Sequence, residues 1–179
     1  MKKVSVLIGE VVDGTPKDYF MVHDETFKTI RVAFLDAEID VVISEYVAAE
    51  SYDGKVKVTG YLASHVTRGS KPVFYFFANS IEETDADVPV TNEVNFSYNV
   101  TKVNKSKVNG RGIDILPLVV ADYTSLQTTS VLYLCIRGKD ARRLQNKPKG
   151  YTIEGKGYLK QYRDIYEIIT TDVTVEDHE

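Results

Sequence analysis

One strand-like segment occurs twice in this chain, and the repeat limits the possible folds more than any other feature. Residues 73–81 align without gaps with residues 165–173. Each copy follows a strand-like run that contains Gly-Tyr-Leu, at residues 60–62 and at residues 157–159, and acidic residues follow each copy. A period close to half of the 179 residues indicates two copies of one small unit instead of one large fold.

Strand patterns dominate both halves of the sequence. Runs rich in Val, Ile, Tyr, Phe and Thr end at Gly, Asp or Asn, which predicts five strands in each half. A short helix fits between the third and fourth strands of each half, at residues 45–53 and 139–145. The predicted strands cover residues 3–12, 19–35, 38–44, 55–66 and 72–82 in the first half and residues 93–103, 112–123, 129–137, 151–162 and 164–175 in the second.

This order of elements predicts the fold. Five strands with a helix between the third and fourth is the arrangement of an OB-fold, a partly open Greek-key barrel. We therefore expect an all-β protein of two tandem OB-folds, each with a short helix between strands three and four. A stretch with a proline and several acidic residues, 84–91, contains the expected linker. We place the first OB-fold at residues 1–85, the linker at 86–91 and the second OB-fold at 92–179.

Charge is divided unevenly along the chain. The formal net charge is −4, but residues 1–88 carry −6 and residues 89–179 carry +2. Between Lys102 and Arg163 there are 13 basic and 4 acidic residues, a net charge of +9. Because charge separated in this way creates a local positive field, the second half is the better candidate for binding a polyanion.

The sequence contains no motif for catalysis or for a cofactor. Gly-x-Ser-x-Gly and Ser-x-x-Lys contexts are missing, and Gly110-Arg111-Gly112 lacks the third glycine of a dinucleotide site. The single cysteine, Cys135, cannot form an internal disulfide and is expected to pack in an apolar strand. The apolar run after Met1 is too short for a signal peptide or a membrane segment. We expect a cytoplasmic protein that is not an enzyme, binds no cofactor and does not contact membranes.

Two groups of residues are candidate metal ligands. Asp36, Glu38 and Asp40 have the spacing of one strand face, which suits either a Mg²⁺ site or a solvated edge, and the lack of a positioned His or Lys favours the edge. The three histidines are scattered over different predicted elements. We therefore expect no metal site. The histidines are His23, His65 and His178.

Basic and aromatic residues of the second half map onto the surface that OB-folds use, which comprises the second and third strands and the loops after strands one and four. Alternation along the third strand directs Leu132, Leu134 and Ile136 inward. Tyr133 and Arg137 then face outward, where they suit either a stacking platform for bases or a solvated sheet. The candidate nucleic-acid-binding residues are Lys102, Lys105, Lys107, Arg111, Tyr133, Arg137, Lys139, Lys156, Tyr158, Lys160, Tyr162 and Arg163.

Four further basic residues lie in or after the second predicted helix. They map less well onto the OB-fold surface, so either DNA binding or simple solubility explains them. These residues are Arg142, Arg143, Lys147 and Lys149.

Short motifs in both halves resemble those of bacterial single-stranded DNA-binding proteins. In the second half, residues 92–94 resemble the opening of that family's first strand, residues 130–142 its third strand and the Gly-basic-x-Ala turn into a helix, and residues 151–156 its fourth strand. In the first half, residues 40–45 and 57–62 occupy the same places. The chain is similar in particular to the tandem OB-fold variety found in Firmicutes and their mobile elements.

The resemblance implies that the protein binds single-stranded DNA, without sequence specificity, in replication, repair or recombination. Since members of that family usually present four OB-folds together, it also implies a homodimer, with replication or recombination proteins as candidate partners. An alternative stays open, in which the OB-folds mediate protein contacts in a replication, conjugation or phage assembly without binding DNA. The +9 segment favours DNA binding, whereas net acidity and the absence of tryptophan favour the alternative.

Overall fold

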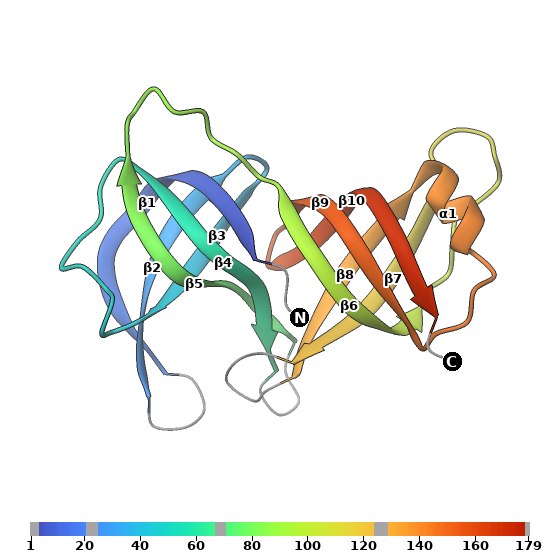
Figure 1. Ribbon diagram of the computed structural model, residues 1–179, viewed down its shortest axis with the longest axis horizontal. Helices are drawn as coiled ribbons and strands as arrows, with labels where there is room; N and C mark the ends of the chain where they lie inside the picture. The colour runs from blue at the N-terminus through green and yellow to red at the C-terminus, as the bar shows by residue number, and fades with distance from the viewer. Residues whose placement is uncertain (1–3, 21–24, 67–70, 124–128, 178–179) are drawn as a thin grey trace.

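The computed structural model contains two closed five-stranded barrels that lie side by side (Figure 1). It describes residues 4–20, 25–66, 71–123 and 129–177. The prediction of two five-stranded barrels is confirmed. The first barrel consists of β1 (Ser5–Phe20), β2 (Thr26–Phe34), β3 (Ala37–Ser44), β4 (Lys55–His65) and β5 (Val73–Thr84), and the second of β6 (Val94–Val103), β7 (Ile115–Tyr123), β8 (Thr129–Arg137), β9 (Tyr151–Tyr162) and β10 (Ile165–Asp177).

Both barrels have the same strand connectivity. Around the first barrel the order is β1-β2-β3-β5-β4, and around the second it is β10-β8-β7-β6-β9, which is the same cycle. The third and fifth strands of each barrel pair in parallel, as β3 with β5 and β8 with β10, and all other neighbours are antiparallel. The two halves of the chain are therefore structural repeats.

The Gly-Tyr-Leu elements occupy equivalent positions in the two barrels. Tyr61 pairs with Phe77 across β4 and β5, and Tyr158 pairs with Ile169 across β9 and β10. A Cβ atom on Gly60 would lie 1.9 Å from the carbonyl oxygen of Phe77, and one on Gly157 would lie 2.3 Å from that of Ile169. Each repeat needs glycine here because the fourth and fifth strands approach too closely for a side chain.

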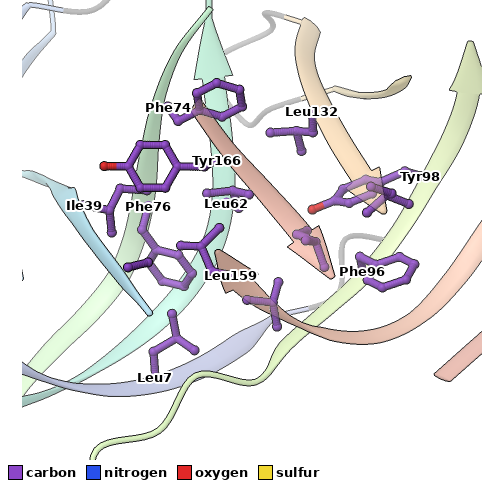
Figure 2. Close-up of a cluster of buried hydrophobic side chains, with 14 of the residues drawn as sticks. Leu7, Ile39, Leu62, Phe74, Phe76, Phe96, Tyr98, Leu132, Leu159 and Tyr166 are labelled. Carbon is purple, nitrogen blue, oxygen red and sulfur yellow. The ribbon is translucent and has the colours of Figure 1, made fainter. Parts of the chain in front are cut away.

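Alternation along the strands separates the barrel interior from the outer surface. Leu132 and Ile136 have no exposed area and Leu134 is 1% exposed, which confirms their predicted inward direction. Tyr133 and Arg137, on the opposite face of β8, are half-buried. Figure 2 shows the interior side chains from both barrels, which form one continuous hydrophobic cluster.

The two barrels contact each other directly. The Phe74 ring of β5 lies 5.6 Å from the Tyr133 ring and 5.7 Å from the Tyr166 ring, measured between centroids, and its proximity to Tyr166 is visible in Figure 2. The buried serines Ser64 and Ser130 bond across the junction: Ser64 Oγ accepts from Val131 N at 3.0 Å, and Ser130 Oγ accepts from Ser64 N at 3.2 Å. This polar and aromatic junction fixes the barrels relative to each other.

One predicted helix differs from the observed structure. Within the described chain, α1 (Gly138–Leu144) is the single helix and follows β8, whereas residues 45–53 form turns and irregular segments. The prediction of a helix in each barrel is therefore wrong. Tyr52 explains the turns, because its backbone N donates to Gly14 O at 3.0 Å and its hydroxyl accepts from Ala49 N at 2.9 Å. None of the described helical residues forms a segment long and apolar enough to cross a membrane.

The first two strands also differ from the prediction in their bounds. The predicted first strand ends at residue 12, but β1 continues to Phe20. Irregular register between Val11 and Asp13 and between Asp13 and Lys17 accommodates the intervening residues. As a result, residues 19 and 20 belong to β1, and β2 begins only at Thr26.

Candidate nucleic-acid interface

Several predicted binding residues meet on one outward face of the second barrel, formed by β8, β10 and β9. We call this the outer face, defined by Arg137, Tyr158, Lys160, Tyr162 and Glu167. Strand pairing aligns them, because Tyr158 pairs with Ile169 and Lys160 pairs with Glu167 across β9 and β10. The charge of Arg137 interacts with Tyr158, Tyr162 and Glu167.

A regular alternation on β9 supplies the chemistry of this face. Lys156, Tyr158, Lys160 and Tyr162 recur at every second residue, so they project to the same side of the strand. Tyr162 is 46% exposed, and the ammonium of Lys160 lies 5.1 Å from the centroid of its ring. An exposed tyrosine beside a lysine offers a stacking surface for bases next to a cation for phosphates.

The base of the outer face is apolar. Cys135 and Ile169 are 6% and 1% exposed although they point outward from the barrel. Burial raises the pKa of the Cys135 thiol, which therefore stays protonated and unreactive at neutral pH. Burial also raises the pKa of Glu167, against the opposing effect of Arg137 and Lys160. In its ionised form, Glu167 disfavours a polyanion on this face.

Tyr133 has the predicted outward direction but packs at the junction of the barrels. Its half-buried ring lies against Phe74 of the first barrel and joins the hydrophobic cluster. The neighbour that covers it is 59 positions earlier in the chain, so alternation along β8 could not predict the contact. Its surroundings favour a structural role for Tyr133.

The loop between β6 and β7 carries a second set of predicted residues. Lys105, Lys107 and Arg111 are exposed there. Asp114, only 2% exposed, holds the loop, because its Oδ1 atom accepts from Asn109 N and Gly110 N, each at 3.0 Å. These backbone hydrogen bonds lower the pKa of Asp114. The loop therefore presents its cations from an anchored backbone.

The remaining predicted residues lie apart from the outer face or at its margin. Lys102 is exposed on β6 and Lys139 on α1, while Arg163 occupies the turn between β9 and β10 with φ of 61°. Lys156 lies 3.2 Å from a carboxylate oxygen of Glu93, an exposed ion pair that a phosphate can replace. The structure thus distributes the predicted residues over an outer face, a loop and separate positions.

The first barrel has an aromatic cluster on its own outer surface that is not among the predicted site residues. Phe77 lies 5.3 Å from Tyr61 in a stacked arrangement and 5.8 Å from Phe27, and Tyr19 lies 6.1 Å from Tyr75. Phe27, Tyr61 and Tyr75 are buried, while Tyr19 and Phe77 are half-buried. The four consecutive aromatic residues at 74–77 are the available signal in the sequence, but they are equally typical of a buried core strand.

Several charges on the first barrel are paired. Arg31 lies 3.1 Å from Glu38 and 2.9 Å from Asp40. Two of the three candidate Mg²⁺ ligands are therefore ion-paired with an arginine. Asp36 instead occupies the turn between β2 and β3 with φ of 64°, so the three do not share one strand face. Within the described part of the chain, no group of three His, Cys, Asp or Glu residues is placed to hold a metal ion.

Comparisons with known proteins agree with this architecture. The structure is similar to that of the wild-type single-stranded DNA binding protein from Thermus aquaticus, with a TM-score of 0.76 and 16% identity over 100% of this chain and 94% of that one. The chain is a tandem OB-fold protein. A deletion mutant of the same Thermus protein gives a TM-score of 0.75 and 15% identity over 100% and 96% of the two chains. No protein-family model matches the sequence, and no curated protein matches it.

Proposed function

We propose that this tandem OB-fold protein binds single-stranded DNA with little sequence preference, mainly through its second barrel. The observation that carries the proposal is the outer face, where Tyr158 and Tyr162 alternate with Lys160 beside Arg137. The fold supports it, since the Thermus protein of the same architecture is a single-stranded DNA binding protein. This function requires no catalytic residue, cofactor or metal ion.

Binding combines stacking with neutralisation of phosphates. A base stacked on an exposed aromatic ring contributes about 1–3 kcal/mol, and every base has a face that can stack, so sequence matters little. Each phosphate neutralised by Lys or Arg adds about −0.7 to the salt dependence of single-strand binding. The outer face supplies the rings, and the β6–β7 loop supplies further cations next to the second and third strands of the barrel.

The first barrel contributes less to DNA affinity in this proposal. Several of its cations pair with carboxylates, as for Lys28 with Asp18 and for Arg31 with Glu38 and Asp40. Its net charge of −6 over residues 1–88 also opposes the approach of a polyanion. The first barrel therefore serves mainly as a partner that covers Tyr133 and Tyr166 through Phe74.

The proposal extends to the cellular setting and the assembly. We assign the protein to single-stranded DNA-binding proteins of the tandem variety from Firmicutes and their mobile elements, acting in the cytoplasm in replication, repair or recombination. A homodimer would bring four OB-folds together, with replication or recombination proteins as further partners. Light scattering of the purified protein tests this assembly. We expect a mass twice the chain mass of 20.2 kDa.

A comparison of single-stranded and double-stranded DNA tests the function. Labelled single strands of mixed sequence are titrated with the protein, with the matching duplex as a competitor. We expect tight binding to different single strands and at least 100-fold weaker binding to the duplex, because paired bases cannot stack on Tyr158 or Tyr162. Equal affinity for single-stranded and double-stranded DNA would contradict the proposal and indicate general polyanion binding instead.

A second candidate function is a protein-interaction module without DNA binding. Tyr162 and Ile165, 46% and 39% exposed, flank the turn between β9 and β10 and form an apolar spot beside Glu167. Such a spot suits a protein partner as well as a nucleobase. Failure to bind any single strand at low salt would favour this second function.

A further inference from the structure

A second basic surface lies away from the outer face, in a groove between the end of β6 and the loop from α1 to β9. The groove has a volume of about 530 Å³. Lys102 enters from β6, and Gln145, Asn146, Lys147 and Lys149 enter from the loop. In Figure 1 this loop descends from α1 at the right edge toward the end of β6.

The groove is held in shape by the backbone. Gly150 N donates to Val100 O at 3.0 Å, which attaches the loop to β6, and Lys147 N donates to Leu144 O at 2.9 Å, which closes the turn after α1. Two of the three lysines, Lys102 and Lys149, are exposed and have no ion-pair partner among the residues that the structure describes. Their ammonium groups therefore face the groove without a compensating carboxylate.

Lys147 has partners that a phosphate can exchange. Its ammonium lies 2.5 Å from the Asp177 carboxylate and 5.2 Å from the centroid of the Tyr151 ring. Because the Asp177 side chain is 72% exposed, this ion pair is well solvated and weak. Displacing Asp177 costs little, and Lys147 then completes a set of three cations in one groove.

The other basic residues of this region are engaged differently. Arg142 lies 3.4 Å from the buried carboxylate of Asp114, and Arg143 donates to Asp140 at 3.1 Å and to Val173 O at 3.3 Å. These arginines attach α1 to its surroundings. Arg142 and Arg143 thus lie outside the groove lining, whereas Lys147 and Lys149 are part of it.

We propose that this groove binds the phosphodiester backbone of the single strand and lengthens its path over the second barrel. The inference rests on the proposed function. Three ammonium groups and the amides of Gln145 and Asn146 are hydrogen-bond donors that suit phosphate oxygens. None of the described residues that line the groove is aromatic, so its ligand is the backbone and not a base.

Salt dependence of binding tests the groove. The variant Lys102→Ala/Lys149→Ala is titrated with oligo(dT) long enough to cover the barrel, at several salt concentrations. The matched control is Lys17→Ala/Lys57→Ala, which removes two exposed lysines of the first barrel that pair with exposed carboxylates. We expect the slope of log K against log salt to become about 1.4 less negative in the groove variant and to stay unchanged in the control.

Outcomes of this experiment separate the two proposals. If the parent protein binds oligo(dT) and both variants keep its slope, the groove proposal is wrong while the proposed function stands. If the parent protein does not bind oligo(dT), both are wrong. Asp177→Asn provides a test in the opposite direction, because it frees Lys147 and should tighten binding several-fold; unchanged affinity would count against the groove.

Discussion

On β8 and β9, residues that hold the barrel together alternate with residues open to a ligand. Leu134 is 1% exposed inside the second barrel, whereas Tyr162 is 46% exposed on the outer face. Tyr133 belongs to neither group, because its ring packs against Phe74 of the other barrel. Stability and binding can therefore be separated by single substitutions.

Leu134→Ala should destabilise the fold. Removing a fully buried leucine side chain leaves a cavity, and we expect the free energy of unfolding to fall by about 2–5 kcal/mol. Denaturant unfolding followed by circular dichroism measures the change. A denaturation midpoint equal to that of the parent protein would show that Leu134 does not face the interior.

Tyr162→Ala should weaken DNA binding without unfolding the protein. Loss of one stacked base predicts about 1–3 kcal/mol less binding free energy, measured with labelled oligo(dT). Tyr46→Ala is the matched control, since Tyr46 is 91% exposed on the first barrel, away from the outer face. If the two variants lose affinity equally, or neither does, the outer face is not the stacking surface.

At the scale of strands, the outer face combines groups that favour and oppose a polyanion. Glu167 on β10 pairs in register with Lys160 on β9, and it lies near Arg137 on β8. Burial raises the pKa of Glu167 in the folded protein. The folded state therefore prefers the protonated carboxyl, and its contribution to stability is present at low pH and lost as pH rises through the raised pKa.

Glu167→Gln should remove this pH dependence. Near pH 7 the neutral amide avoids burying a charge, so the variant should melt at a higher temperature than the parent. Below the ordinary pKa of glutamate both side chains are neutral, and the two proteins should melt at similar temperatures. Thermal unfolding at pH 4 and pH 7 measures the difference; the same difference at both pH values would contradict the assignment.

The sequence predicts strands and barrels where the signals are local. Gly60 and Gly157 mark equivalent close approaches of strands, and alternation places Leu134 inward, so both could be found without the structure. The turns at residues 45–53 could not be predicted from local signals, because the backbone N of Tyr52 is held by Gly14 of a distant strand. Within the candidate site, the alternation of lysine and tyrosine along β9 can be recognised from the sequence alone.

The burial of Tyr133 by Phe74 and the ion pairs of Arg31 require the fold, because they join residues from different strands. The groove likewise depends on how the α1–β9 loop meets β6. Tertiary neighbours therefore decide which of the predicted cations and rings are open to a ligand.

At the scale of the whole molecule, the junction makes the two barrels one unit. The hydrophobic cluster runs through both, with Phe74 between Tyr133 and Tyr166. Ser64 Oγ donates to Val131 O at 2.6 Å and accepts from Val131 N at 3.0 Å. We expect the barrels to unfold in a single transition, since neither can separate without exposing these groups.

Ser64→Ala should weaken the junction. It leaves the backbone N and O of Val131 without their partner at a buried contact, which predicts a loss of about 1–3 kcal/mol in unfolding free energy. Ser51→Ala, at an exposed position of the same barrel, is the control and should leave stability unchanged. Two separate unfolding transitions in the parent protein would contradict the single unit.

The most direct test of the central claim is a titration of fluorescent oligo(dT) with the parent protein at two salt concentrations. We predict saturable binding at low salt and weaker binding at high salt. For each phosphate that the protein contacts, log K should fall by about 0.7 per unit of log salt. Binding should persist in part at high salt, because stacking on Tyr158 and Tyr162 does not depend on counterions. No binding at low salt would contradict the account.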